Sequence, residues 1–393
     1  MDPRTNPYAP GAGSPPPELA GRDRVIETAA IALDRMRHGL VARSVMLVGL
    51  RGVGKTVLLN RLHREAERRG FATVLLEAPE KRSLPALLVP AMRAALLKLD
   101  RLAAGGDLAK RALRALGGFV QAMKLKYDDI EFGVDLGLEP GGADTGDLDA
   151  DLISLFQAVG EAAQERHTVT VLFIDELQYV PEEQLAALIT ALHRCAQMQL
   201  PVTMVGAGLP QLVGQMGRAK SYAERLFEFV QVGPLPEDAA RQAITAPALR
   251  FGVHYEEAAL QEIVHQTQGY PYFLQEWGKH SWTCAERSPI SEADVQAATR
   301  QALAELDASF FRVRLDRLTP SEKRYLRAMA ELGPGPHRSG DIADILGREV
   351  RTVAPTRAKL IDKGMIYSPA HGDTDFTVPL FDAYMRRVMP ALP

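Results

Sequence analysis

An eight-residue glycine-rich segment has the spacing G-x-x-x-x-G-K-T and lies between a short apolar run and an amphipathic stretch. Its residues are Gly49, Leu50, Arg51, Gly52, Val53, Gly54, Lys55 and Thr56. Glycines allow backbone N–H groups to approach phosphate oxygens, and the lysine brings a positive charge to the β- and γ-phosphates. The threonine hydroxyl is a ligand for Mg²⁺, and the helix expected next directs its N-terminal dipole at the anion. The segment therefore predicts a site for ATP and Mg²⁺; a plain glycine turn is the alternative.

A second candidate is the acidic pair Asp175-Glu176, which closes the apolar run at 169–176. In P-loop NTPases, a carboxylate at the end of a buried strand holds Mg²⁺. We expect Asp175 to do this through water, together with Thr56, and Glu176 to orient or deprotonate the attacking water. The alternative is that the acidic pair only caps the strand.

Short apolar runs separated by helical stretches must position these residues. Strands are expected over 44–49, 71–78, 169–176, 201–208 and 227–232. Continuous apolar strands of this kind indicate a parallel sheet that is covered on both faces. We predict an α/β fold: a P-loop NTPase core with a parallel five-stranded sheet, an all-helical lid domain and a C-terminal winged helix-turn-helix.

The composition of the chain sets the expected domain boundaries. Six prolines within the first 17 residues predict a disordered tail over 1–20. The ATPase core is expected over 21–235, with an insertion at 79–151 that holds a helix at 85–99 and a β-hairpin. The hairpin is predicted from two alternating runs, Met123-Leu125-Tyr127 and Ile130-Phe132-Val134-Leu136-Leu138. The lid and linker follow over 236–318, and the winged helix over 319–393.

The C-terminal segment shows three helical stretches and then two short strands around His371–Asp375. The third helix is expected to begin near Pro355 and is rich in positive charge, which suits the phosphates of double-stranded DNA. A protein partner, or packing on the lid, is the alternative, because the predicted wing carries the acidic Asp373 and Asp375. The expected DNA contacts are Arg351, Arg357, Lys359 and Lys363.

Overall charge and cysteine content restrict the class of protein. There are 46 basic and 49 acidic residues, so any nucleic-acid contact must come from a local basic face. The two cysteines build neither a disulfide framework nor a metal cluster, and His280 with Cys284 is expected to be packing. The chain has no apolar run of roughly 20 residues and no signal-peptide pattern, so we expect a cytoplasmic protein without membrane contact.

The motifs GLRGVGKT and VLFIDE resemble Walker A and Walker B of the AAA+ ATPases, near the origin-recognition-type and STAND branches. The segment PPPELAGRD is similar to one that lies over the adenine in this superfamily, which implies that Arg22 binds the cofactor. Gly269-Tyr270-Pro271 resembles the G-x-P element of STAND-type lids, which implies that Pro271 packs near the base.

The resemblance also implies an arginine finger, which stabilises charge on the γ-phosphate. Arg225 stands in the corresponding place just before the fifth predicted core strand, and Arg218 competes for the role. A finger supplied by a neighbour would require a homo-oligomer. A surface arginine paired with Glu224 or Glu228 is the alternative.

Two departures from the family pattern imply slow hydrolysis. Gly206-Ala207-Gly208 occupies the place of the usual polar sensor, and the G-x-P element replaces the lid arginine. The function implied is an AAA+/STAND-like ATPase that acts as a nucleotide-dependent conformational switch. One alternative is a DNA-binding helper of replication or transposition; another is a protein-interaction switch in signalling or defence with ATP as a structural cofactor.

Overall fold

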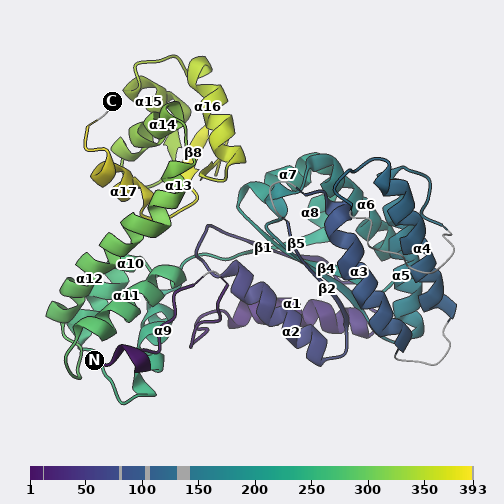
Figure 1. Ribbon diagram of the computed structural model, residues 1–393, viewed down its shortest axis with the longest axis horizontal. Helices are drawn as coiled ribbons and strands as arrows, with labels where there is room; N and C mark the ends of the chain where they lie inside the picture. Colours follow the sequence, from purple (N-terminus) through teal and green to yellow (C-terminus); the bar gives the residue numbers. More distant parts are fainter. Residues whose placement is uncertain (12, 79–81, 102–106, 131–141, 392–393) are drawn as a thin grey trace. The chain divides into compact units, whose positions relative to one another are not determined.

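The computed structural model describes residues 1–11, 13–78, 82–101, 107–130 and 142–391 (Figure 1). The chain forms two compact units. The first combines Met1–Asp23, Gly49–Gly54 and Val232–Pro393, and the second combines Arg24–Val48 with Lys55–Gln231.

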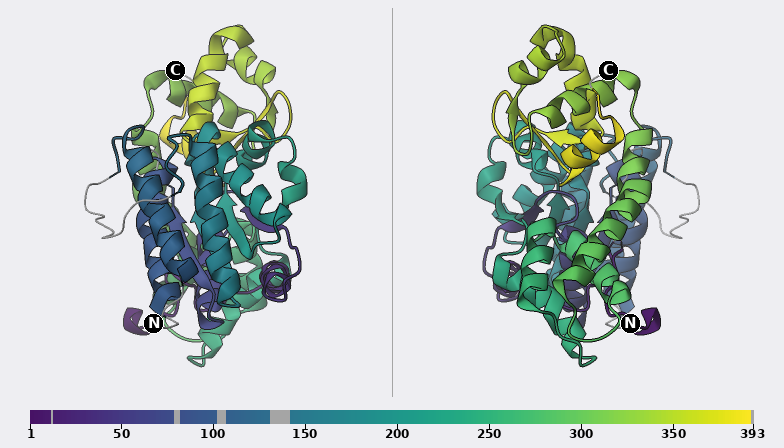
Figure 2. Two further views of the ribbon diagram at one scale, coloured as in Figure 1. Left: turned by 90° about the vertical axis from the view of Figure 1, so that its right-hand side faces the viewer. Right: turned by 90° about the vertical axis from the view of Figure 1, so that its left-hand side faces the viewer.

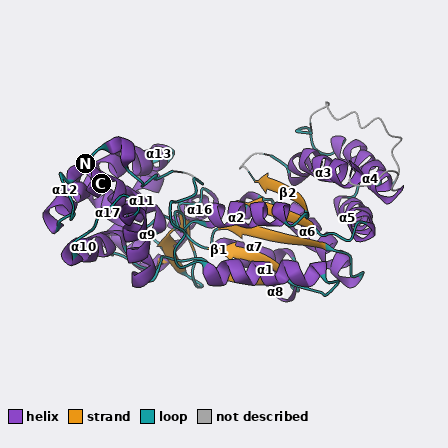
Figure 3. Ribbon diagram, turned by 90° about the horizontal axis from the view of Figure 1, so that it is seen from below, coloured by secondary structure: helices purple, strands orange, loops and turns teal. Residues whose placement is uncertain are grey.

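The second unit is built on five parallel strands in the order β2-β3-β4-β1-β5 (Figure 3). All residues of β1, β3 and β4 are buried, as expected for a sheet covered on both faces. The predicted α/β fold with a five-stranded parallel sheet is confirmed. The strands are β1 (Ser44–Val48), β2 (Ala72–Glu77), β3 (Thr170–Asp175), β4 (Val202–Gly208) and β5 (Phe227–Gln231).

The order of the strands brings the candidate residues to one edge of the sheet. β4 lies between β1 and β3, with Val48 opposite Gly208 and Ile174 opposite Gly206. Parallel strands end at the same edge, which is where α/β proteins bind ligands. The glycine-rich loop after β1 and the acidic pair at the end of β3 therefore both emerge beside the end of β4.

Helices cover the sheet, and α3 to α6 pack successively against one another (Figure 2). Their apolar faces join the strands in one core, which includes Phe119, Phe156 and Met204. The helices are α1 (Asp23–Arg37), α2 (Lys55–Arg68), α3 (Leu84–Arg101), α4 (Asp107–Lys124), α5 (Leu148–Glu165), α6 (Glu182–Gln197), α7 (Gln211–Ala219) and α8 (Ala223–Leu226), with a 3-10 turn η2 (Leu177–Tyr179).

The first strand of the predicted hairpin is wrong. Met123 belongs to the last turn of α4, and Leu113, Leu116, Val120 and Met123 are buried on that helix. This helical spacing outweighs the three-residue alternation from which the strand was predicted. Ile130 is buried outside a strand, whereas Phe132, Val134, Leu136 and Leu138 lie outside the described residues.

In the first unit, residues 236–318 are mostly helical, and their role as a lid stays a prediction. The helices α9 to α12 are here called the lid helices. They are α9 (Glu237–Leu249), α10 (Glu257–Thr267), α11 (Pro271–Cys284) and α12 (Glu292–Leu306), and α12 continues through the π-helical η3 (Asp307–Phe311) into α13 (Arg312–Asp316).

The N-terminal segment differs from the predicted tail, since it packs on the lid helices. A short 3-10 turn η1 (Pro3–Thr5) forms there, and Tyr8 is buried. The Tyr8 hydroxyl donates to the Ile244 carbonyl, and Trp282 Nε1 donates to the Asp2 carbonyl at 3.0 Å. One buried aromatic ring and backbone hydrogen bonds outweigh the disorder that the proline-rich composition suggests.

Residues 319–393, here called the C-terminal domain, contain four helices and a three-stranded antiparallel sheet in the order β6-β8-β7 within the part that the structure describes. The third helix begins at Val350 rather than near Pro355, because buried Val353 extends the apolar face of Leu360. The name winged helix stays a prediction. The elements are α14 (Pro320–Glu331), β6 (His337–Arg338), α15 (Ser339–Ile345), α16 (Val350–Asp362), β7 (Ile366–Tyr367), β8 (Asp373–Phe376) and α17 (Phe381–Val388).

Candidate nucleotide site

The backbone of the glycine-rich loop requires its glycines. Gly52 and Gly54 have φ angles of +81° and +92°, in the left-handed region that other residues enter at a cost. At Gly49, an added Cβ would lie 2.0 Å from the carbonyl oxygen of Val232. The loop thus keeps a conformation in which side chains are excluded, as close approach of a phosphate demands.

Lys55 and Thr56 open α2 directly after this loop, so their backbone N–H groups belong to the first turn of the helix. Lys55 is buried, with 7% of its surface exposed. The Thr56 hydroxyl donates to Asp175 Oδ2 at 2.6 Å. This contact brings together the two residues that were predicted to serve a metal ion.

The Thr56–Asp175 pair suits Mg²⁺, which prefers hard oxygen ligands and bridges to substrate phosphates. Burial raises the pKa of Asp175, the Thr56 hydrogen bond lowers it, and the neighbouring Glu176 charge raises it. A bound divalent cation would relieve the cost of that buried negative charge. The donor set therefore fits the ion that the sequence predicts.

Glu176 lies beyond β3 in the left-handed region, with φ of 55°. Its backbone N–H donates to Asp175 Oδ1 at 2.8 Å, and its carboxylate accepts a hydrogen bond from the side-chain amide of Gln178. A non-glycine residue in this conformation is costly, and such strain is concentrated at functional sites. The turn separates the directions of the two adjacent carboxylates.

Gln178 is the residue that the sequence analysis missed. Its Oε1 accepts from the Leu209 N–H at 3.0 Å, just beyond β4, while its amide nitrogen serves Glu176. An added Cβ at Gly208 would lie 2.9 Å from this Oε1. The glycine in place of a polar sensor therefore makes room for a polar side chain from the neighbouring strand end. The sequence signal that could have identified Gln178 is a glutamine two residues after the acidic pair, combined with a glycine-rich end of β4.

The Arg22 side chain is hydrogen-bonded to the glycine-rich loop. Its guanidinium is buried and donates to the carbonyl oxygens of Val53, at 3.0 Å, and Gly233, at 2.6 Å. Burial lowers the pKa of Arg22. These contacts fix the glycine-rich loop against the start of the segment that leads to the lid helices. Binding of the base by Arg22 stays a prediction.

The G-x-P element lies against the same loop. Pro271 is the first residue of α11, where its fixed φ suits a helix start. Tyr272 N–H donates to the Gly52 carbonyl at 3.2 Å, and a Cβ at Gly52 would lie 3.3 Å from Tyr272 Cβ. Gly269 has a φ of +72° and packs on Leu235. Contact between Pro271 and a base stays a prediction.

The two candidate arginine fingers differ in their surroundings. Arg218 pairs with Glu182 at 3.3 Å, not with either glutamate named in the sequence analysis. Arg225 is exposed at the end of α8 and forms no ion pair with any residue that the structure describes. The arginine-finger role of either residue stays a prediction.

The four predicted DNA contacts are divided in the structure. Arg357 donates to Thr374 Oγ1 at 2.8 Å and to the Asp373 carbonyl at 2.8 Å, so it holds the start of β8. Lys363 pairs with buried Glu322 at 2.7 Å. These two residues therefore stabilise the domain. Arg351 and Lys359 are exposed on α16.

A parallel sheet with a glycine-rich phosphate loop and a Thr–Asp pair beside it defines a P-loop nucleotide-binding protein. Residues 18–205 match the model of the AAA ATPase domain family, so this part of the chain is an AAA ATPase domain. Residues 308–385 match a domain of unknown function, DUF8462. The resemblance to AAA+ ATPases is confirmed for the first of these segments.

Similar proteins are found over most of the chain. An uncharacterized HTH-type transcriptional regulator of Methanocaldococcus jannaschii is 22% identical over 347 residues, covering 86% of this chain and 80% of the relative. A Walker-type ATPase of Pyrococcus abyssi has a similar structure, with a TM-score of 0.59, 16% identity, and 94% and 96% of the two chains covered. The latter likeness shows a shared fold.

A weaker likeness, with a TM-score of 0.46 and 15% identity, is to the Aeropyrum pernix Orc1 protein in complex with DNA, covering 95% and 94% of the chains.

Within the described part of the chain, every helix is too short or too polar to cross a bilayer.

Proposed function

We propose that this protein binds ATP with Mg²⁺, hydrolyses it slowly, and uses the nucleotide state to change the contacts of its lid helices and C-terminal domain. The carrying observation is that the phosphate loop is hydrogen-bonded to both. Tyr272 N–H donates to Gly52 O at 3.2 Å, and Arg51 N–H donates to Thr377 O at 3.0 Å. A nucleotide that changes the conformation of this loop would therefore change the hydrogen bonds of Tyr272 and Thr377.

An aromatic series supports coupling from the loop to the C-terminal domain. The Tyr272 ring stacks on Phe310 with centroids 4.8 Å apart, and Phe310 contacts Phe311 at 5.2 Å. Phe311 in turn stacks on Tyr384 of α17 at 5.0 Å. Packed side chains with two discrete arrangements are one physical means of coupling distant sites.

The chemical roles follow from the side chains. Lys55 would neutralise phosphate charge, while Thr56 and Asp175 would hold Mg²⁺, which would supply further positive charge at the phosphates. Glu176 would orient water and accept its proton at Oε1, because Oε2 accepts the Gln178 amide. Arg225 of a second copy would supply the positive charge for the γ-phosphate, which makes a homo-oligomer part of the proposal.

Hydrogen exchange tests the switch directly. We expect the Tyr272 N–H to exchange more slowly with a non-hydrolysable ATP analogue than with ADP, since ATP should close the lid on the loop. Equal exchange rates in both states, with binding of each nucleotide verified by calorimetry, would contradict the switch.

DNA binding is the second candidate function. It is favoured by Arg351 and Lys359, which are exposed on the same helix, and by the name of the Methanocaldococcus jannaschii relative. A titration of labelled duplex DNA at several salt concentrations, with and without ATP, tests it. If no affinity exists at low salt, a protein partner is favoured instead.

A further inference from the structure

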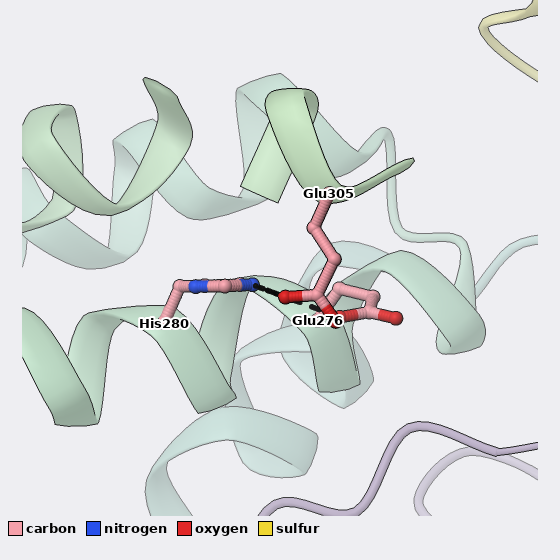
Figure 4. A group of neighbouring side chains, drawn as sticks. All are labelled: Glu276, His280 and Glu305. Carbon is pink, nitrogen blue, oxygen red and sulfur yellow. Dashed lines mark ion pairs between the residues drawn. The ribbon is translucent and has the colours of Figure 1, made fainter. Parts of the chain in front are cut away.

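A second polar cluster lies within the lid helices, apart from the nucleotide site. Glu276 and His280 are one helical turn apart on α11, and Glu305 reaches them from α12; the three side chains point toward one another (Figure 4). Their ligand atoms all lie within 4.8 Å of one another. The cluster thus joins two helices of the lid.

Two of these side chains are buried, and each has one polar atom that makes no hydrogen bond of good geometry. Glu276 and His280 are 5% and 8% exposed. Among the residues that the structure describes, Glu276 Oε2 accepts no hydrogen bond, and His280 Nε2 has the Glu305 carboxylate at 3.1 Å but without hydrogen-bond geometry. Burying a carboxylate oxygen and a ring nitrogen in this way is costly unless something binds them.

The distances suit a metal ion. His280 Nε2 lies 3.1 Å from Glu305 Oε2 and 3.9 Å from Glu276 Oε2. Tetrahedral ligands at about 2.0–2.1 Å from Zn²⁺ would be roughly 3.4 Å apart, so small side-chain movements suffice. One imidazole and two carboxylates are all zinc ligands, and the exposed side of Glu305 leaves room for water as the fourth.

A neighbouring tyrosine holds one of the two carboxylates in place. Tyr272 Oη donates to Glu276 Oε1 at 3.0 Å, which orients the carboxylate and leaves Oε2 for the cluster. Hydrogen bonds of this kind are typical of the residues around metal ligands. The Tyr272 N–H also donates to the Gly52 carbonyl, so this one residue of α11 contacts both the cluster and the phosphate loop.

Lys279 is the competing cation. Its Nζ lies 2.8 Å from Glu305 Oε1 and 3.8 Å from Glu276 Oε2. It pairs closely with only the exposed carboxylate, so it leaves the buried Glu276 oxygen without a hydrogen bond. A metal ion at the cluster would displace this ammonium group toward solvent, where a lysine is well hydrated.

We propose that Glu276, His280 and Glu305 form a Zn²⁺ site that ties α11 to α12. The test uses the full-length protein, treated with a chelator and then titrated with Zn²⁺ by calorimetry without nucleotide. We expect one equivalent to bind and to raise the melting temperature. His280→Gln and Glu305→Gln should each weaken binding by more than about 100-fold, since loss of an outer partner alone costs 10–100-fold.

Two further variants separate a metal site from a simple charge cluster. Lys279→Met should tighten Zn²⁺ binding by about tenfold, because it removes the competing charge. His265→Gln, at an exposed histidine on α10, is the matched control and should leave the affinity unchanged. Absence of stoichiometric Zn²⁺ binding in the wild type, or wild-type affinity in both His280→Gln and Glu305→Gln, would overturn the proposal. Glu305→Gln keeps the result decisive if His280→Gln fails to fold, since Glu305 is half exposed.

Discussion

The side-chain amide of Gln178 donates a hydrogen bond to the Glu176 carboxylate while its oxygen accepts one from Leu209 N–H. One side chain thereby links the ends of β3 and β4. The Gln178 side chain fills the space that a polar side chain at position 208 would take. The candidate base, Glu176, is therefore oriented by a residue that follows the same strand, β3.

Replacing Gln178 by glutamate tests this link. Gln178→Glu keeps an acceptor for Leu209 N–H but places a second negative charge against Glu176. We expect turnover to fall by about 10-fold or more, because like charges repel at short distance, while ATP affinity is kept. Single-turnover hydrolysis and calorimetry measure the two quantities. Gln215→Ala, which removes only a 3.3 Å bond to the Gln178 carbonyl, is the control.

Replacing Glu176 by glutamine should separate binding from hydrolysis. Glu176→Gln keeps the shape but removes the base, so turnover should drop on the order of 10²–10⁴-fold with nearly unchanged ATP affinity. Wild-type turnover is expected to be slow, and the assay must therefore run over many minutes. Equal rates for the two proteins would exclude Glu176 as the base.

Removing the positive charge of the phosphate loop should abolish binding. Lys55→Ala deletes the ammonium group expected on the β- and γ-phosphates, and we expect no measurable Mg²⁺-dependent ATP binding by calorimetry. Asp175→Asn should weaken the Mg²⁺ dependence and also reduce turnover. If Lys55→Ala retains the wild-type affinity, the site assignment is wrong.

Shortening Phe310 should uncouple the loop from the C-terminal domain. Phe310→Ala removes the ring between Tyr272 and Phe311. We expect ATP to slow hydrogen exchange at the Arg51 N–H, which donates to Thr377 O, and we expect Phe310→Ala to abolish this effect. ATP affinity should change little, because Phe310 touches none of the phosphate-loop residues named above. Phe251→Ala, in the ring pair with Trp282, is a control outside this series. A normal response in Phe310→Ala would argue against the aromatic route.

The divided roles on α16 predict different phenotypes. Arg351→Ala with Lys359→Ala should weaken DNA binding and lower the salt slope by about two, without changing stability. Arg357→Ala should instead lower the melting temperature, because it removes the Arg357 hydrogen bonds to the buried Thr374 hydroxyl and to the Asp373 carbonyl. Loss of DNA affinity from Arg357→Ala alone, at full stability, would reverse these assignments.

The sequence was sufficient for the features that depend on local spacing. The glycine-rich loop, the apolar strands and the contact between Thr56 and Asp175 were all predictable, because motif and strand order determine them. Gln178 was not, since its role depends on the empty space at Gly208, which belongs to a strand almost 30 residues away. The Tyr8 contacts were hidden for a similar reason: composition describes a segment but not the helices on which it packs.

The helical rod formed by α12, η3 and α13 has a mechanical consequence. At 1.5 Å per residue it is roughly 37 Å long, so a pivot of about 10° at its lid end displaces its far end by about 6 Å. The π-helical turn in this rod brings Phe311 against Phe381 and Tyr384, which fastens the C-terminal domain to the rod. Under the proposed switch, the rod would act as a lever arm, because a shift of about 1 Å beside a phosphate at its lid end would be enlarged several-fold at the C-terminal domain.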